Sequence, residues 1–390
     1  MSRAVILEAL RTPIGKFQGG LSALSAPELA APVVKELLAR YPGLPVTEAI
    51  FGNVVSAGVG QAPARQASLK GGLPSSTSAL TINKVCGSGL KAIQLAAAGV
   101  LMGDHEAILA GGMESMSNAP YLMPKLRAGA RMGHTEAKDA MIHDGLWCAM
   151  TDQSMGATGE LVSQKYGVSR EAQDAWSFHS HQKALKAMAD GAFKGEIVPV
   201  TVPGRKGDTI VDADEGPRAD TSLESLAKLK PAFKKDGTVT AGNAPSVNDG
   251  AAAALVTTED FAKAHGLAVQ ARILGWATAG LDPEWVTMAP VPAIQKLLGK
   301  LGWGVGDVEL WEINEAFAVQ MVATANELAI PVDRINVHGG AVALGHPIGA
   351  SGARVMATLL GALKRHGKAR GIAALCLGGG NAIAMAVERV

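Results

Sequence analysis

The two ends of this chain of 390 residues repeat one another, and this repeat limits the possible folds more than any other feature. Lys35 and Leu37 recur as Lys296 and Leu298, at an offset of 261 residues (296 − 35). Three further matches follow in the same order at slightly larger offsets: residues 48–53 with 309–314, Ser88-Gly89 with Ser351-Gly352, and Gly111-Gly112 with Gly378-Gly379. An ordered series of matches with a slowly drifting offset is expected of a duplicated domain with small insertions. The sequence therefore predicts two similar halves.

Strand-like and helix-like segments alternate through the first half. Strands are expected at 5–10, 48–55, 79–85 and 107–110, and helices at 27–40, 62–70 and 88–102. Such alternation is typical of α/β proteins whose sheet is covered by helices. We predict an α/β fold with a largely parallel sheet.

The repeat also locates an insertion in the first half. In the second half, three glycines lead directly into a final strand at 382–389, whereas the corresponding strand of the first half, 251–257, lies far beyond Gly112. Residues 117–247 are therefore an excursion, with one clear helix at 170–190 and a locally basic composition. Two compatible interpretations stay open: a solvated cap or oligomer contact, and a lid that binds an anionic cosubstrate.

Composition narrows the class of protein. Hydrophobic residues make up 48% of the chain and charged residues 18%, as in globular proteins. A net charge of +1 argues against a nucleic-acid or anionic membrane surface as partner. The three cysteines do not form a disulfide framework and no signal-peptide pattern begins the chain, so we expect a reducing, cytoplasmic location. No Cys/His spacing typical of zinc is present, and no metal is expected.

Cys86 lies in a segment with the pattern strand, tight turn, helix. The turn Gly87-Ser88-Gly89 opens onto an alanine-rich helix, which places the sulfur at a helix N-terminus, where a thiolate is favoured. The alternative is a buried cysteine that only fills space, which is the commoner case for an isolated cysteine. Two later segments, each with a reactive side chain among glycines, favour the functional interpretation.

His346 precedes another glycine-rich helix start, the position that Cys86 occupies in the first half. Two pseudo-symmetric halves would bring these helix starts face to face, so that the imidazole could take the proton of Cys86. A lone histidine is more often structural, and we expect that of His338, which lies earlier in the same loop.

Cys376 and Asn314 complete the set of candidate catalytic side chains. Cys376 ends a buried strand and is followed, after one leucine, by three glycines whose N–H groups could approach an oxyanion. Asn314 could orient a water or donate to an oxygen, although asparagine also favours helix N-caps. The chain has no P-loop and no dinucleotide-binding glycine motif between a strand and a helix.

These motifs together resemble those of the thiolases, which are acetyl-CoA C-acyltransferases, and the resemblance runs from end to end. It rests on residues 85–89 (VCGSG), 111–117 (GGMESMS), 314–317 (NEAF), 345–352 (GHPIGASG) and 376–380 (CLGGG). It implies two duplicated α/β halves in five αβαβα layers with an inserted loop domain. On this basis we expect an N-terminal half at 1–117 and 248–268, a loop domain at 118–247 that binds CoA, and a C-terminal half at 269–390.

The resemblance also implies a division of catalytic labour. Cys86 would carry the acyl group as a thioester and His346 would activate it, while Cys376 would exchange a proton with the α-carbon of acetyl-CoA or with the thiol of CoA. His346 and a water held by Asn314 would stabilise an enolate oxygen, and the N–H groups of Cys86 and Gly378 would hold the tetrahedral oxyanion. The implied reaction joins two acetyl-CoA molecules into acetoacetyl-CoA, or cleaves a 3-ketoacyl-CoA with CoA. CoA is expected as substrate, with no tightly bound cofactor.

Contacts with CoA and the oligomeric state follow from the same resemblance. The expected CoA-binding residues are Leu146, Met155, Arg218, Ser246 and Phe317. Residues 121–141 correspond to a tetramerisation loop, so a homotetramer is expected, with a dimer next. The chain departs from the family pattern at Ser154, Gly159, Pro245 and Val286. These departures leave open the acyl-chain length and the CoA contacts; direction and pathway are open too.

Four other functions are alternatives to this one. A ketoacyl-synthase shares the duplicated fold but uses two histidines beside its cysteine, and Asn314 stands at the second position. A non-catalytic carrier of CoA esters or lipids need not keep Cys86, His346 and Cys376 together. A longer-chain degradative thiolase stays open, whereas nothing in the sequence favours a papain-like hydrolase.

Overall fold

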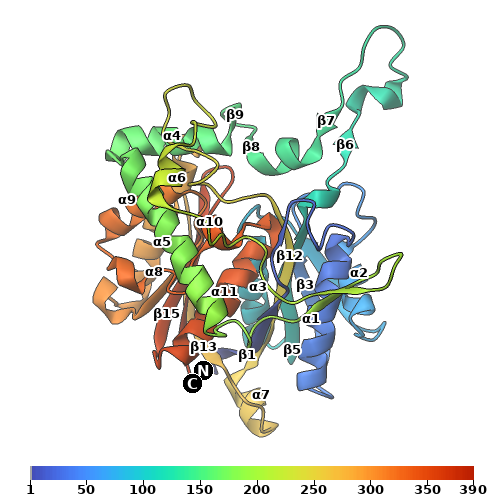
Figure 1. The fold of residues 1–390 in the computed structure, drawn as a ribbon. Coiled ribbons are helices and arrows are strands. Elements are labelled where there is room, and N and C mark those ends of the chain that lie inside the picture. The colour runs from blue at the N-terminus through green and yellow to red at the C-terminus, as the bar shows by residue number, and fades with distance from the viewer. Residues whose placement is uncertain (1) are drawn as a thin grey trace.

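The structure, a computed structural model, describes residues 2–390. Its main sheet is built from β1 (Ala4–Arg11), β2 (Gly15–Lys16), β3 (Val46–Gly52), β4 (Ser78–Ile82), β5 (Ala107–Ser115), β12 (Asn248–Thr258), β13 (Ala271–Gly280), β14 (Leu310–Ile313), β15 (Arg370–Leu377) and β16 (Asn381–Arg389). Nine of these strands follow the order β14-β15-β16-β13-β1-β12-β5-β3-β4, and the tenth, β2, pairs with the start of β12 (Figure 1).

The strand order confirms the internal duplication. Read outward from the middle, it runs β1-β12-β5-β3 on one side and β13-β16-β15-β14 on the other, so that each half contributes the same series. The two series join where β1 pairs with β13 through only two residue pairs, Val5 with Arg272 and Ile6 with Ala271. The repeated segment 48–53 largely coincides with β3, and its match 309–314 contains β14.

The expectation of a largely parallel sheet is wrong, because the sheet is mixed. Among the strands that the structure describes, β3 is parallel to β4 and β5, and β14 is parallel to β15, whereas the other pairings are antiparallel. Parallel strands need a crossover connection, which helices provide between β3, β4 and β5 and between β14 and β15. A tight turn at Gly378–Gly380 instead folds β16 back onto β15.

Helices divide the protein into five layers, as expected. The helices are α1 (Ala26–Arg40), α2 (Pro63–Lys70), α3 (Ser88–Met102), α4 (Met155–Tyr166), α5 (Arg170–Ala189), α6 (Leu223–Ala227), α7 (Glu259–Ala264), α8 (Pro290–Leu301), α9 (Ala318–Leu328), α10 (Ala341–Leu344) and α11 (Ile348–Arg365). Helices α1 and α2 cover the outer face of the first half, α8 and α9 cover that of the second, and α3 and α11 lie between the halves. The repeated residues in α1 and α8 thus lie on equivalent outer helices.

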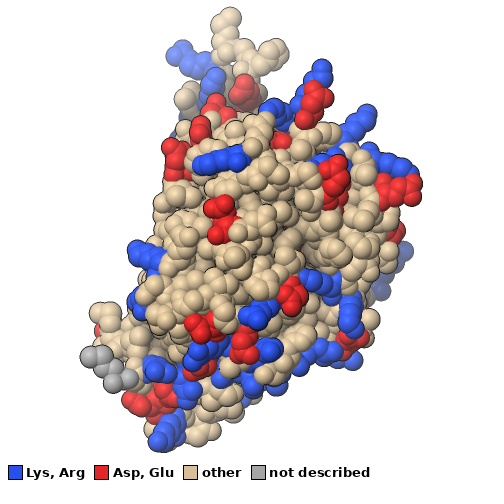
Figure 2. All heavy atoms as spheres, turned by 90° about the vertical axis from the view of Figure 1, so that its left-hand side faces the viewer, with Lys and Arg blue, Asp and Glu red and all other residues tan. Residues whose placement is uncertain are grey.

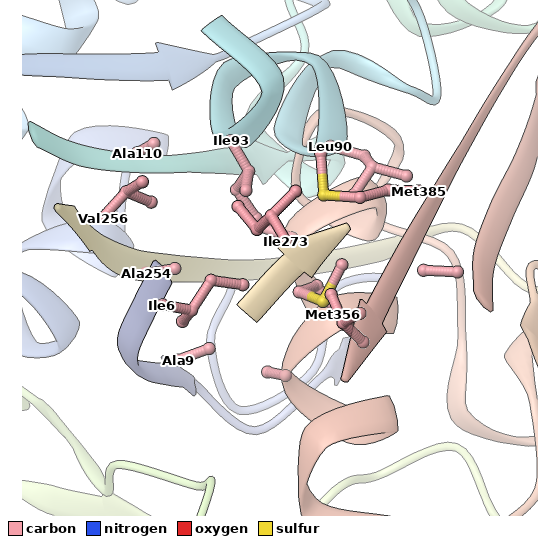
Figure 3. Packing of buried hydrophobic residues seen from close by; sticks show 14 of the residues in the cluster. Ile6, Ala9, Leu90, Ile93, Ala110, Ala254, Val256, Ile273, Met356 and Met385 are labelled. Carbon is pink, nitrogen blue, oxygen red and sulfur yellow. The ribbon is translucent and has the colours of Figure 1, made fainter. Parts of the chain in front are cut away.

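The central layer is the largest continuous core. Leu90 and Ile93 of α3 and Met356 of α11 meet strand residues of both halves, such as Ile6 and Ile273 (Figure 3). By length and composition, residues 85–102 could cross a membrane, but α3 is packed here between the two halves.

The repeated Ser-Gly pairs mark the crossing of α3 and α11. A Cβ atom on Gly89 would lie 2.6 Å from the backbone nitrogen of Ala353, so the two backbones approach too closely for a side chain at this position. The same crossing brings the N-termini of both helices together. The predicted meeting of the two helix starts is therefore observed in the fold.

The inserted segment carries α4, α5 and α6 and a set of short elements. These are β6 (Tyr121–Leu122), β7 (Lys138–Asp139), β8 (Trp147–Cys148), β9 (Gln153–Ser154), β10 (Val200–Val202), β11 (Thr209–Val211), η1 (Met116–Asn118), η2 (Pro124–Ala128) and η3 (Met141–Leu146). Further short turns are η4 (Pro283–Met288), η5 (Val305–Asp307) and η6 (Val332–Arg334). Strands β6 and β7 form an arm that projects from the body (Figure 1). The predicted domain boundaries stay a prediction.

Candidate active site

Cys86 lies in a turn that the backbone holds under strain. Strand β4 ends at Ile82, three residues earlier than expected, and Val85 adopts a φ of +46°, which is rare for a β-branched residue. Ser88 Oγ donates to the Val85 carbonyl at 2.6 Å and accepts from the Lys84 N–H at 2.8 Å, which closes the turn. Strained turns of this kind cluster at functional sites. The turn presents the sulfur at the start of α3.

Burial controls the ionisation of Cys86. It raises the pKa of the thiol to about 12, while the nearby backbone N–H groups of Gly378 and of Cys86 itself act in the opposite direction. Burial therefore opposes the thiolate that the start of a helix favours, and the upward shift of the pKa means that desolvation outweighs the N–H donors. Cys86 rests as a thiol and needs a base when it reacts.

His346 is placed to be that base. Its backbone N–H donates to Asn248 Oδ1 at 2.8 Å, and its Nδ1 lies 2.6 Å from Ser351 Oγ. Ser351 Oγ also lies 2.9 Å from the Pro347 carbonyl oxygen. When the hydroxyl proton goes to that carbonyl, Nδ1–H donates to Ser351 and Nε2 keeps the lone pair. Burial lowers the pKa of His346 to about 3, so the imidazole rests neutral and able to accept a proton.

Asn314 lies next to Nε2, the nitrogen of His346 that keeps the lone pair. Its Nδ2 is 3.5 Å from His346 Nε2, and its backbone N–H donates to the Ala374 carbonyl beyond the end of β14. The side-chain Oδ1 is buried and has no hydrogen-bond partner among residues 2–390. The amide thus presents an unpaired polar atom next to the imidazole and is not a helix cap.

Cys376 and Gly378 come from the end of β15 and the turn that follows it. Burial, and the nearby Cys86, raise the pKa of the Cys376 thiol above its usual range. The backbone N–H groups of Gly378 and Cys86, which come from the two halves of the molecule, both act to lower the pKa of the Cys86 sulfur and so lie near it. Two such N–H donors form an arrangement suited to an oxyanion.

The reactive groups open into one cavity of about 430 Å³. Of the residues singled out in the sequence, the cavity is lined by Cys86, Leu146, Met155, Ser246, Phe317, His346, Cys376 and Gly378. Most of the remaining wall is apolar and includes Met116, Ile142, Phe233, Val286 and Ile348. The site therefore combines two thiols and one imidazole with a largely apolar cavity wall.

Two expected site residues do not line this cavity. Asn314 is fully buried and reaches the site only through its contact with His346 Nε2. The Arg218 side chain is 64% exposed and points to Asp220 at 3.7 Å, so no contact of Arg218 with the cavity is observed. Sequence reasoning in turn missed the roles of Ser351 and Asn248, which hold His346. Ser351 lies inside a motif that drew attention for its glycines, whereas nothing in the sequence distinguishes Asn248.

The comparisons with known proteins agree with this geometry. Residues 4–260 match the N-terminal domain of thiolase, and residues 267–389 match its C-terminal domain. The chain belongs to the thiolase family. This thiolase is 52% identical to the acetyl-CoA acetyltransferase of Pseudomonas aeruginosa, with 100% of both chains covered. It is 50% identical to a probable acetyl-CoA acyltransferase of Staphylococcus epidermidis, with 100% of this chain and 99% of that protein covered.

A solved structure extends the likeness to the fold. The crystal structure of the Bacillus anthracis acetyl-CoA acetyltransferase superposes with a TM-score of 0.98 at 42% identity, covering 100% of this chain and 99% of the other. The predictions of a thiolase, of an acyltransferase and of the thiolase fold are therefore confirmed.

Proposed function

We propose that this thiolase joins two acetyl-CoA molecules into acetoacetyl-CoA and CoA, and catalyses the reverse thiolysis, through an acyl group carried on Cys86. The observation that carries the proposal is that Cys86, His346, Cys376 and Gly378 all line one cavity. Relatives of full length that are named acetyl-CoA acetyltransferase support the choice of acyl group. CoA acts as substrate, and the chemistry calls for no metal or tightly bound cofactor.

In the first half-reaction, Cys86 Sγ attacks the thioester carbonyl while His346 Nε2 takes its proton. The resulting oxyanion accepts hydrogen bonds from the N–H groups of Cys86 and Gly378. Collapse breaks the bond between the carbonyl carbon and the sulfur of CoA, and Cys376 gives its proton to the departing thiolate. The site then holds acyl-Cys86, an imidazolium at His346 and a thiolate at Cys376.

In the second half-reaction, the Cys376 thiolate removes a proton from the α-carbon of the next acetyl-CoA. Its raised pKa makes this thiolate a strong base. The enolate oxygen accepts hydrogen bonds from His346 Nε2–H and from a water held by Asn314, and the enolate carbon attacks the acyl carbonyl. When the bond to Cys86 breaks, its sulfur regains the proton from His346, which restores the resting state.

A spectrophotometric assay tests the reaction. Purified protein should consume the enolate absorbance of acetoacetyl-CoA only when CoA is added, and Cys86→Ser should abolish this activity. Protein that binds CoA esters without turnover of any 3-ketoacyl chain length would instead support a carrier of CoA esters or lipids.

A preference for longer acyl chains is the second candidate. The apolar wall of the 430 Å³ cavity and the Staphylococcus epidermidis relative, named an acyltransferase, favour it. Leu146, Met155, Ser246 and Phe317 would then contact the pantetheine or the acyl chain. Values of kcat/KM for 3-ketoacyl-CoA substrates from four to sixteen carbons decide between the two candidates. A maximum at four carbons supports the acetyl-specific enzyme.

We also propose a homotetramer, formed through the arm around β6 and β7. Exposed apolar side chains along this arm, among them Tyr121, Leu126 and Met132, support an assembly contact. Light scattering of the purified protein tests the proposed homotetramer, and deletion of the arm should reduce the number of subunits in the assembly.

Surface charge and the cysteines bear on partners and location. On the face that carries α8 and α9, acidic and basic side chains are interspersed, and such a mixed surface is unsuited to binding a nucleic acid or an anionic membrane (Figure 2). The free cysteines support a cytoplasmic location.

A further inference from the structure

Glu114 is a buried carboxylate that the catalytic steps above do not use. It lies next to the end of β5, is fully buried, and accepts hydrogen bonds from four N–H groups. Its partners are Asn53 Nδ2 at 2.8 Å, the Val54 N–H at 3.1 Å, the Val55 N–H at 3.2 Å and the Gly349 N–H at 2.9 Å. All four are donors, so both carboxyl oxygens act as acceptors. Glu114 therefore joins segments of both halves of the protein.

One side of this junction leads to His346. Gly349 is in the first turn of α11, where free N–H groups and the helix dipole favour an anion. A Cβ atom on Gly349 would lie 2.7 Å from Glu114 Oε2, so helix and carboxylate are in direct contact. Residues Gly345 to Pro347 run straight into this turn. The position of the carboxylate therefore sets the position of the His346 loop.

The other side leads to Cys86 through a chain of hydrogen bonds. Glu114 accepts from the Val54 N–H, and the Val54 carbonyl accepts from Asn83 Nδ2 at 3.4 Å. Asn83 Oδ1 in turn accepts from the N–H of Val85 at 2.9 Å. Val85 is the strained residue that turns the backbone into Cys86. A single carboxylate thus supports both the nucleophile and its base.

We infer that Glu114 is a positioning residue, which fixes the Cys86 turn and the His346 loop relative to each other for proton transfer. The inference rests on the proposed function, because it concerns the geometry of the same reaction. Substrate contacts are not involved, since Glu114 does not line the cavity. Its loss should thus slow the chemical step and leave substrate binding in place.

The substitution Glu114→Gln tests this inference. Glutamine keeps the shape but turns an NH₂ group toward the N–H donors, so at least one oxygen contact is lost. Displacement of a reacting group by about 1 Å can cost on the order of 100-fold in rate. We expect a loss of kcat and of the rate of Cys86 acetylation by acetyl-CoA of that order, with KM unchanged.

Glu309→Gln is the matched control. Glu309 also accepts hydrogen bonds from two backbone N–H groups, those of Ala369 at 2.7 Å and Arg370 at 3.1 Å. It lies just before β14, however, at the end of this strand opposite to Asn314 and the active site. Its kcat should equal that of the unmodified protein. A folded Glu114→Gln variant with unchanged kcat overturns the inference.

Asn83→Ala provides a second route if Glu114→Gln does not fold. It breaks only the connection toward Cys86, at an exposed position. Slower acetylation of Cys86 with unchanged KM supports the inference, and an unchanged acetylation rate overturns it. An unmodified protein that is never acetylated would refute the proposed function instead, so the two failures are distinguishable.

Discussion

The contact between Ser351 and His346 offers a quantitative test of how this thiolase generates its nucleophile. Ser351 Oγ is the hydrogen-bond partner of His346 Nδ1, at 2.6 Å, and both side chains are buried. During acyl transfer His346 takes the Cys86 proton and becomes an imidazolium, whose Nδ1–H must donate. Ser351→Ala removes the acceptor at that moment.

The size of the effect follows from the burial of this pair. A hydrogen bond to a charged group contributes about 1.5–3 kcal/mol, and a buried donor without a partner costs a similar amount. Since about 1.4 kcal/mol corresponds to tenfold, the rate of Cys86 acetylation should fall by roughly 10- to 150-fold. Binding of acetyl-CoA should not change, because Ser351 does not line the cavity.

Rapid mixing with acetyl-CoA, followed by acid quench and mass spectrometry, measures the acetylation rate directly. Ser68→Ala is the matched control, because Ser68 is equally buried and its Oγ donates to the Ala64 carbonyl at 2.7 Å, one helical turn back, as Ser351 does to Pro347. Ser68→Ala should leave the rate unchanged. An unchanged rate in folded Ser351→Ala would refute the role of the Nδ1 contact.

Three further predictions concern proton transfer, packing and pH. Cys376→Ala should slow the acetylation of Cys86 without abolishing it, because a thiolate can also leave unprotonated, but should lose carbon–carbon bond formation, which product analysis after acetylation measures. Gly89→Ala should lower the midpoint of urea unfolding, because over-packing at the crossing of α3 with α11 costs about 1–3 kcal/mol. The control Gly299→Ala should not lower it, because a Cβ atom there meets no atom within 4 Å. Burial lowers the pKa of His338 from 6.5 to about 4. The neutral imidazole therefore contributes fully to the free energy of unfolding above pH 6.5, and this contribution is lost as the pH falls toward 4. His338→Gln should therefore flatten the fall in Tm between about pH 7 and about pH 5, and an equally steep fall would contradict this.

The duplication was predictable because it leaves matches at nearly constant offsets. Its consequence, the symmetric strand order, follows once each repeated segment is placed on a strand or helix. The direction of the strands was not predictable in the same way. Helix–strand alternation indicates crossovers, but the turn at Gly378–Gly380 and the long insertion give no sign of the direction in which the chain returns.

The chemical identity of the site could be read from the sequence, whereas its electrostatics could not. Cys86, His346 and Cys376 stood out by residue type among glycines, and the structure brings them to one cavity. Ionisation depends on burial, which comes from the whole fold, and the upward shift of the Cys86 pKa was therefore not predictable from the turn alone. The contact of Asn248 with the backbone of His346 likewise joins residues distant in sequence.

The most direct test of the account is to find where the acyl group is carried. After brief incubation with acetyl-CoA and digestion at low pH, mass spectrometry should find one acetyl group, on Cys86, and Cys86→Ser should carry none. The result that contradicts the account is an acetyl group on Cys148 or Cys376, or turnover by a protein in which Cys86 is never acetylated.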